Sequence, residues 1–214
     1  MSSTERSELQ RLAEWGSEDL EAVFAILDAA FVAHVGFQSN QQPIVIPMIY
    51  GRDGDALYLH GSAGSRLLNK LDTGVPACVS VTVIDGLVLA RSAYHHSINY
   101  RSVVAFGTGR KIVEPLRKRA ALRTICEHML CGRWSEVRGP SREELNATTV
   151  IEFSIKVASA KSRRGPPKDE EDDYGRPVWA GILPLQLQAA APEADARLAE
   201  GIGVPAYVLK ARNA

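Results

Sequence analysis

The chain has 214 residues, and its 25 Lys and Arg residues are balanced by 25 Asp and Glu residues. This balance leaves no overall field that would attract nucleic acid or anionic lipid, and a hydrophobic content of 45% is typical of a globular protein. Three cysteines make no disulfide framework and have no zinc-site spacing. The charged N-terminus lacks a signal-like apolar region and no run has the length of a membrane span, so we expect a cytoplasmic protein.

The composition changes twice along the chain. Residues 1–16 are polar and are expected to form a lead-in, and residues 17–214 to form a single domain. A C-terminal extension begins at about residue 163 with the segment RRGPPKDEEDDYGRP, whose prolines and acidic run indicate a solvated loop.

Helical periodicity is clearest at the start of the domain. Leu20, Val23 and Leu27 recur at helical spacing, which predicts a helix from an N-cap at Ser17 to about Ala30. Further helices are expected over residues 65–73, 115–131, 141–147 and 192–200.

Between these helices the pattern is that of β-strands. The expected strands are 31–38, 43–51, 56–61, 77–92, 100–114 and 149–162, with a possible edge strand at 204–211. Strands joined mostly by hairpins favour a mainly β, α+β fold, with an antiparallel Greek-key or closed barrel and flanking helices.

The stretch LYLHGSAGSRLLNKL, residues 57–71, has the order that a phosphate site needs. A strand ends at His60, a turn of small residues follows, and Ser65 and Arg66 open a short helix. Free backbone N–H groups, the Ser65 hydroxyl and the Arg66 guanidinium together suit a phosphate. The same pattern also occurs as an ordinary helix start with a Ser N-cap.

A second polar segment, RSAYHHSINYRS at residues 91–102, lies between two hydrophobic strands. We expect the segment to form either a rim of hydrogen-bond donors and aromatic rings beside a ligand or a solvated connection between the two strands. His95 and His96 are adjacent and would face opposite ways on a strand, so no metal site is expected. The chain also lacks a Gly-x-Ser-x-Gly elbow, its acidic residues cluster in the loop at 169–173, and nothing resembles a paired-carboxylate hydrolase site, so chemistry is expected to belong to a bound cofactor.

Four stretches together resemble one family: PIVIPMIYGRDGDALYLHGSAGSRLLNKL, GLVLARSAYHHSINYRSVVAFGTG, SAKSRRGPP and RPVWAGILPL. They are similar to the pyridoxamine 5′-phosphate oxidase-like split-barrel flavoproteins, in particular the flavin-nucleotide-binding branch that includes nitroimidazole-resistance proteins. The resemblance implies a six-stranded antiparallel split barrel with flanking helices. It also implies a homodimer with FMN in the clefts between the subunits.

Carried over by position, the resemblance implies the residues that contact FMN. Ser65 and Arg66 would anchor the phosphate with help from Lys70, and Arg101 and Ser102 would reach the flavin from the other subunit. Trp179 would cover the site near the interface. The residues expected to line the ring and the ribityl chain are Ile44, Val45, Ile46, Pro47, Tyr58, Leu59 and His60.

Two departures from the true oxidase argue against pyridoxamine-phosphate oxidation. Leu67 stands where the oxidase has a further basic residue, and the C-terminus VPAYVLKARNA lacks its Arg-Leu-His motif. The expected function is therefore an FMN-dependent oxidoreductase acting on an unidentified small molecule, with NAD(P)H as a candidate electron donor. No catalytic residue is assigned, and neither nucleic acid nor membrane is expected as a partner.

Two alternatives remain open. The chain would equally suit a flavin store, sensor or carrier without turnover, and a deazaflavin is a variant of the enzyme hypothesis. Some split-barrel relatives bind haem through a histidine, for which His60, His95 and His96 are the candidates here.

Overall fold

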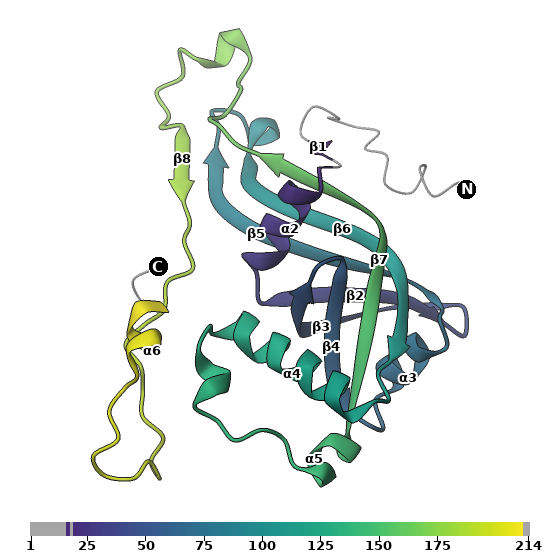
Figure 1. The fold of residues 1–214 in the computed structure, drawn as a ribbon. Coiled ribbons are helices and arrows are strands. Elements are labelled where there is room, and N and C mark those ends of the chain that lie inside the picture. The colour runs from purple at the N-terminus through teal and green to yellow at the C-terminus, as the bar shows by residue number, and fades with distance from the viewer. Residues whose placement is uncertain (1–15, 18, 212–214) are drawn as a thin grey trace.

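The computed structural model describes residues 16–17 and 19–211. The predicted polar lead-in therefore lies outside the described residues apart from Gly16. Figure 1 shows a curved β-sheet with helices packed against it and a C-terminal segment along one side. None of the described helices is both long and apolar enough to cross a membrane.

Six strands close into an antiparallel ring, which confirms the predicted barrel with flanking helices. The ring runs in the order β7, β4, β3, β2, β5, β6 and returns from β6 to β7. Its strands are β2 (Val32–Ser39), β3 (Gln42–Asp53), β4 (Ala56–Ser62), β5 (Pro76–Leu89), β6 (Ser97–Lys111) and β7 (Thr148–Arg163). The short strand β1 (Gly16–Ser17) pairs with β7, and β8 (Gly181–Pro184) pairs with β5.

The barrel core forms because alternate residues of each strand are apolar. Val79 and Val81 of β5, Val103 of β6 and Phe153 of β7 are all fully buried in it. Two helices add side chains to this core. Helix α2 (Leu20–Asp28) contributes Val23, Ile26 and Leu27, and α3 (Arg66–Asp72) contributes Leu67, Leu68 and Leu71.

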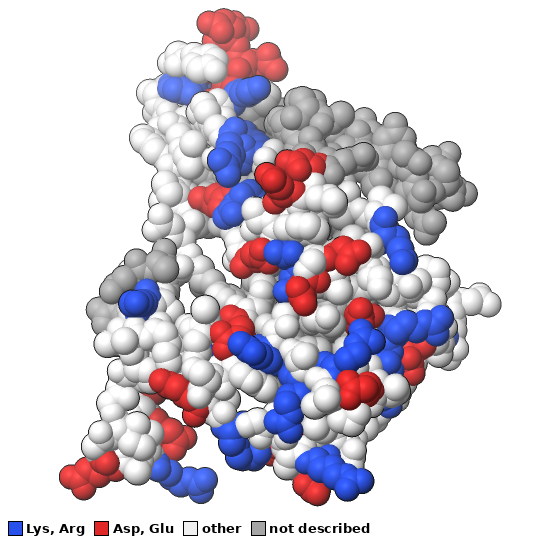
Figure 2. Space-filling view, in the orientation of Figure 1, with Lys and Arg blue, Asp and Glu red and all other residues white. Residues whose placement is uncertain are grey.

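The remaining helices lie outside the ring. Helix α4 (Pro115–Met129) begins with a proline in its first turn and packs on β3 and β4. Helix α5 (Arg142–Ala147) begins with a capping box between Ser141 and Glu144. Figure 2 shows Lys and Arg intermingled with Asp and Glu over the visible face, as expected for a chain without net charge.

Three local predictions are wrong. Ser17 is not the cap of the first helix, because it lies in β1 and pairs with Ala160 of β7. The N-cap is Asp19, whose side chain accepts a hydrogen bond from the backbone N–H of Glu21 at 3.0 Å. Residues 192–200 form no helix, because their side chains are exposed all round and so short a segment has no packing face to hold it. Residues 206–211 are helical rather than extended.

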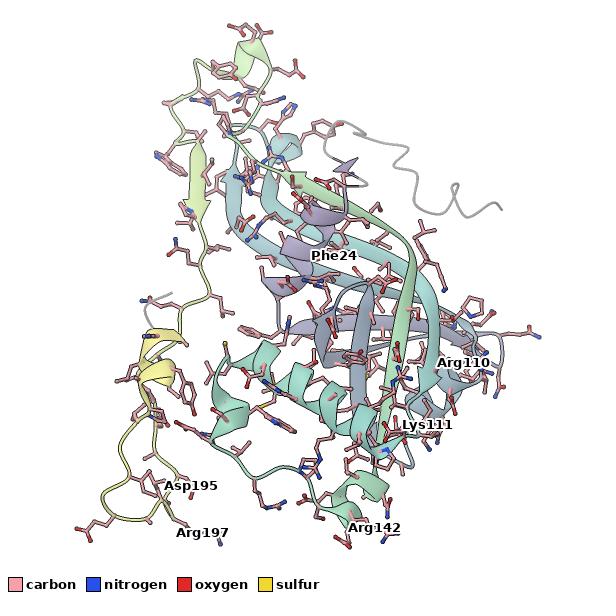
Figure 3. All side chains as sticks on the ribbon, viewed as in Figure 1. Phe24, Arg110, Lys111, Arg142, Asp195 and Arg197 are labelled. Atoms are coloured by element: carbon pink, nitrogen blue, oxygen red, sulfur yellow. The ribbon has the colours of Figure 1, made fainter. Side chains whose placement is uncertain are left out.

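The last helix, α6 (Ala206–Ala211), follows Pro205, and proline is favoured at a helix start. Its Tyr207 accepts a hydrogen bond from Arg133 at 2.9 Å and donates one to Glu136 at 2.6 Å, which fixes the helix beyond the end of α4. Figure 3 places Asp195 and Arg197 at the far loop of the C-terminal segment, away from the barrel.

Candidate functional site

The strand, the turn and the short helix predicted around Ser65 are present, and phosphate binding there stays a prediction. Strand β4 ends at Ser62, and α3 begins at Arg66 after an N-cap at Ser65. The Ser65 hydroxyl oxygen accepts a hydrogen bond from the backbone N–H of Leu68 at 3.4 Å. That contact leaves the hydroxyl hydrogen of Ser65 available to an acceptor outside the helix.

Some of the backbone donors of this turn are already used. Ala63 donates to the carbonyl of Ala147 at 2.9 Å, and Ser65 donates to the carbonyl of Ser62 at 3.0 Å. Within the described part of the chain, the N–H groups of Arg66 and Leu67 have no acceptor, as is usual in a first helical turn.

Arg66 is the free cation of the turn. Its side chain is exposed and, among the described residues, makes no ion pair or hydrogen bond. Lys70, one turn further along α3, is half-buried. An exposed guanidinium beside unpartnered backbone donors is an arrangement that binds an anion in two-pronged fashion.

The residues expected to line the flavin on β3 alternate between two environments. Ile44 and Ile46 pack against the barrel core, whereas Pro47 is exposed and the side chain of Val45 is 64% exposed. Because neighbouring strand residues face opposite sides, the side chains of these four cannot all meet one ligand. Backbone groups of β3 remain the contacts that all four could share.

The same alternation divides β4. Leu59 is fully buried in the core, and its neighbour Tyr58 packs beneath α4 with Ile112 and Ala121. His60 belongs to the α4 side of the strand, where it lines a cavity of about 450 Å³ between the barrel and the helical layer. This volume lies within the range of ordinary small-molecule sites.

The wall of the His60 cavity is mostly apolar. Its apolar members come from β3, from α4 and from the chain that follows α4: Ile49, Leu122, Ile125, Met129, Trp134 and Pro140. The polar members are His60, Cys126, Arg138 and Glu144. Arg138 donates to both carboxylate oxygens of Glu144, at 2.7 and 2.6 Å, and both side chains are exposed.

His60 is the unusual member of this wall. Its Nδ1 atom is buried and has no hydrogen-bond partner among the described residues. An orphaned buried polar atom costs about 1–3 kcal/mol, so this ring nitrogen is held in place by the packing around it. Burial also lowers the pKa of His60, which keeps the ring neutral at pH 7.

Gly51 explains how α4 comes so close to the barrel at this cavity. A Cβ atom at Gly51 would lie 2.7 Å from the backbone N and Cα atoms of Ile125, nearer than atoms can pack. The missing side chain thus lets the backbone of α4 rest directly on β3.

Arg101 lies at a different place in the molecule. Its guanidinium contacts Asp85 at 2.8 Å, and both residues line a cavity of about 1130 Å³ that the C-terminal segment covers with Leu185. Ser102 donates to the carbonyl of Lys161 at 3.4 Å. Trp179 is 67% exposed.

A third cavity, of about 610 Å³, contains Ile44 and Val45 together with Cys78 and Phe106. One chain therefore does not gather the predicted cofactor residues into a single cavity. Ser65 and Arg66 share the turn after β4, while His60, Arg101 and Val45 line three separate cavities.

The acidic loop is tied to the polar segment at residues 91–102. Asp169 accepts from the backbone N–H groups of Arg91 and Ser92, at 2.9 and 3.3 Å, and pairs with the Arg91 guanidinium. Burial opposes ionisation of Asp169, but these donors outweigh it and lower its pKa. The loop is thus anchored, although Glu170 and Asp172 are exposed.

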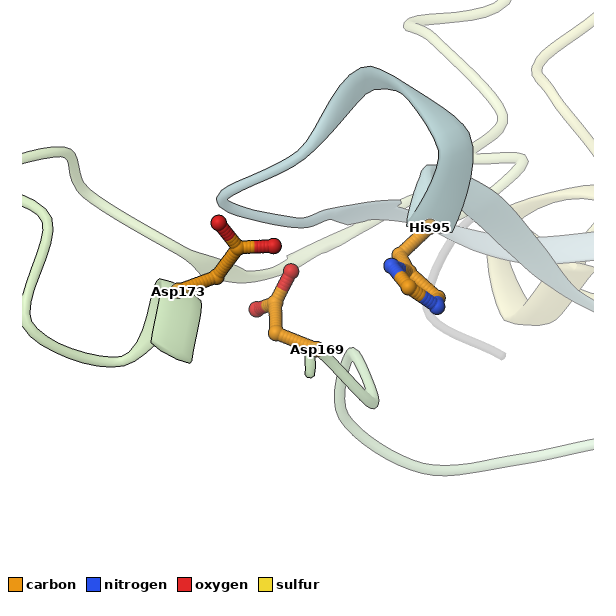
Figure 4. A group of neighbouring side chains, drawn as sticks. All are labelled: His95, Asp169 and Asp173. Carbon is orange, nitrogen blue, oxygen red and sulfur yellow. The ribbon is translucent and has the colours of Figure 1, made fainter. Parts of the chain in front are cut away.

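Figure 4 shows His95, Asp169 and Asp173 in this region, with one potential metal-ligand atom from each within 4.8 Å of the others. The Asp169 carboxylate is already occupied by the Arg91 and Ser92 donors, and His95 Nδ1 lies 3.0 Å from the Ser92 hydroxyl. The contacts of this cluster are those of a loop clamp.

The side chains that complete the His60 cavity were missed at the level of sequence. The stripe of Leu122, Ile125, Cys126 and Met129 predicts only a helix with a buried face. Nothing in its spacing distinguishes residues that line a cavity from residues that fill a core. An interrupted apolar face opposite a strand histidine would have been the only available signal.

Comparison with known proteins shows which family and which solved structures the chain is similar to. Residues 19–162 match the family model described as pyridoxamine 5′-phosphate oxidase. The flavocytochrome Anf3 from Azotobacter vinelandii is 40% identical, with a TM-score of 0.89 over 96% of this chain and 95% of that one. The FAD and haem binding protein from Mycobacterium smegmatis is 36% identical, with a TM-score of 0.88 over 92% of this chain and 97% of that one.

A more distant likeness shows the fold alone. A structure described as a candidate 5-nitroimidazole antibiotic resistance protein from Bacteroides thetaiotaomicron is 22% identical, with a TM-score of 0.57 over 68% of this chain and 85% of that one. No curated protein matches the chain. The barrel and the family match over residues 19–162 agree, and the chain belongs to the pyridoxamine 5′-phosphate oxidase family.

Proposed function

We propose that this protein is a flavin-binding oxidoreductase that holds the flavin phosphate at Ser65 and Arg66. The observation that carries the proposal is the exposed, unpartnered Arg66 guanidinium beside the unpartnered N–H groups of Arg66 and Leu67 in the described structure. Membership of a flavin-binding family supplies the ligand class for this anion site. Lys70 adds a second positive charge one helical turn away.

The flavin itself is proposed to be FMN, as the family resemblance implies. FAD is the alternative, because the name of the M. smegmatis relative contains it. Both carry a phosphate on the ribityl chain, so both suit the turn at Ser65. Leu67 in place of a basic residue leaves Arg66 as the main phosphate ligand.

We further propose that two copies of the chain form the site, in a cytoplasmic homodimer. The support is the separation of Arg66, Val45 and Arg101 within one chain, since residues expected around one flavin lie in different places. Placing Arg101 of one copy against the turn of another would complete one site from two surfaces.

The chemistry would come from the flavin, which accepts a hydride or electrons from a donor such as NAD(P)H and passes them on. The chain's own residues would bind the phosphate, orient the ring and exclude water. A flavin carrier without turnover is the competing function, because no described side chain near the turn is placed as a general base.

Haem binding is a second candidate function. The names of the two relatives that are 40% and 36% identical describe a flavocytochrome and a protein that binds FAD and haem. The specific observation that favours it here is the apolar cavity with the orphaned His60 imidazole. Bound haem would supply one-electron chemistry beside the flavin.

The test begins with the absorbance spectrum of the purified protein, followed by chromatography of the cofactors released on denaturation. Flavin near one per chain is expected, and its retention time separates FMN from FAD. A protein that neither carries nor binds flavin would refute the flavin proposal. Stopped-flow mixing with NADH and NADPH separates an enzyme from a carrier, because a carrier is not reduced at a useful rate.

The dimer is tested by light scattering during gel filtration of the flavin-loaded protein. A mass of two chains is expected. A monomer that retains flavin would contradict the shared site while leaving the phosphate turn intact.

A further inference from the structure

The cavity between β4 and α4 is mostly apolar, and a single imidazole lines it. Six of the side chains that line it are apolar, and its volume is about 450 Å³. The one imidazole in the wall, His60, has a buried nitrogen without a partner. Neutral imidazole is a common ligand of haem iron.

The other histidines are engaged or lie elsewhere. His128 donates to the carbonyl of Ala30 at 2.8 Å and packs against Tyr50, with the ring centroids 4.7 Å apart. His95 and His96 contact Ser92 at 3.0 and 2.9 Å. His34 lines the cavity beside Arg101. Of the five histidines, His60 alone has a buried unpartnered ring nitrogen.

Cys126 and Glu144 are the other possible metal ligands on this wall, and the Glu144 carboxylate is held by Arg138. Burial raises the pKa of the Cys126 thiol, and the neighbouring Glu127 acts in the same direction. Iron and other metals bind the thiolate rather than the thiol, so Cys126 is a poor ligand at pH 7.

The mouth of the cavity carries one positive charge that a ligand could use. Arg138 is exposed and bonded only to its neighbour Gly139 and to Glu144 in the described structure. A ligand carboxylate can replace Glu144 on the same guanidinium face, because the fork geometry is the same for both.

We infer that this cavity is the haem site, in which His60 would bind the iron and Arg138 would bind a peripheral carboxylate of the porphyrin. The inference rests on the haem part of the proposed function and adds the location and the ligand. It also places the haem near the flavin phosphate. His60 and Ser65 are five residues apart, so their Cα atoms are separated by at most about 18 Å.

The primary test is titration of flavin-loaded protein with hemin, followed through the Soret band. The wild type is expected to bind one hemin per chain, and His60→Ala to lose affinity by roughly 100-fold or more. His96→Ala is the matched control and is expected to bind as the wild type does. An unchanged circular-dichroism spectrum and an unchanged unfolding midpoint in His60→Ala show that the variant is folded.

A rescue experiment separates ligation from packing. Added imidazole is expected to restore the wild-type Soret position in His60→Ala, because the free ligand fills the vacated place. A merely structural role for His60 predicts no such return.

The carboxylate contact is tested separately. Arg138→Gln is expected to weaken hemin binding roughly tenfold without moving the Soret band, whereas Arg142→Gln, another exposed arginine, has no effect. Glu144→Gln, which preserves the capping geometry, is expected to bind hemin as tightly as the wild type or more tightly.

The outcomes distinguish the site from the function. A wild type that takes up no stoichiometric hemin refutes haem binding altogether. A wild type that binds hemin while His60→Ala does so with unchanged affinity and band position refutes the site and leaves haem binding standing. Loss of the band in His96→Ala but not in His60→Ala would move the site to the turn at Ser92.

Discussion

The hydroxyl of Tyr50 donates a hydrogen bond to the carbonyl of Leu27, which joins strand β3 to the last turn of α2. Tyr50 is fully buried, and burial together with Asp28 raises its pKa, so it remains a donor throughout the physiological pH range. Tyr50→Phe is expected to lower the free energy of unfolding by about 1–2 kcal/mol. Urea denaturation measures the change. Tyr58→Phe, which removes a hydroxyl with no described partner, should leave stability nearly unaltered.

Arg66→Ala removes the one free guanidinium of the phosphate turn. Loss of charge-assisted hydrogen bonds is expected to weaken flavin binding by about 2 kcal/mol, or roughly 30-fold. Fluorescence quenching of added flavin gives the dissociation constant. Arg142→Ala changes an equally exposed arginine on α5, labelled in Figure 3, and serves as the control. Equal affinities in the two variants would rule out the phosphate assignment.

Gly51→Ala introduces a methyl group where the backbone of Ile125 lies only 2.7 Å away. Helix α4 must move outward, so we expect a loss of about 1–3 kcal/mol in the free energy of unfolding and a distorted His60 cavity. Thermal unfolding detects the first effect and hemin titration the second. Gly175→Ala meets no atom within 4 Å and provides the comparison. Unchanged stability in Gly51→Ala would mean that α4 does not rest on β3 as described.

Asp169→Asn weakens the clamp between the acidic loop and the polar segment. Its carboxylate accepts three donors from Arg91 and Ser92, and the neutral amide replaces one oxygen by a donor. We expect faster proteolytic cleavage within residues 163–177. Asp172→Asn alters an exposed carboxylate of the same loop and should be cleaved at the wild-type rate. Equal cleavage of both variants would show that Asp169 does not hold the loop.

His60 should also make stability depend on pH. Burial lowers its pKa in the folded state, so below its unfolded value of about 6.5 the unfolded chain takes up a proton that the folded chain does not. Stability is therefore unaffected by this group above pH 6.5 and falls as the pH drops toward the folded pKa. The apoprotein variant His60→Gln is expected to lose less stability between pH 6.5 and 5 in urea titrations. A parallel decline in both proteins would contradict the buried, neutral ring.

Most of the barrel could be predicted because strand alternation and turn residues are local signals. The hairpin at Asp53-Gly54 and the capping box at Ser141 depend on a few neighbouring side chains. The prediction failed where contacts between residues far apart in the chain determine the local structure. Ser17 pairs with Ala160, and Tyr207 binds Arg133 and Glu136, and neither partner can be seen from the local pattern.

The candidate site shows the same difference between local signals and contacts of distant segments. The turn and helix start at Ser65 and Arg66 depend on consecutive residues, and their backbone arrangement is found as predicted. The cavity at His60 depends on Gly51 allowing α4 to approach and on Trp134 and Arg138 returning to its mouth. Such contacts join segments that are far apart in the chain, so composition and spacing do not reveal them.

Strand β8 has a consequence for the order in which the molecule is completed. The ring of six strands closes with β7, which ends at Arg163, whereas the outer part of β5, already paired with β6 on one edge, acquires its second partner only when Gly181–Pro184 pairs with residues 86–89. During synthesis that edge of β5 stays open for some twenty residues after the ring can close. An unpaired edge is a template for association with other chains. The C-terminal segment is thus the last cover placed on the nascent barrel, and a prematurely ended chain would expose the edge permanently.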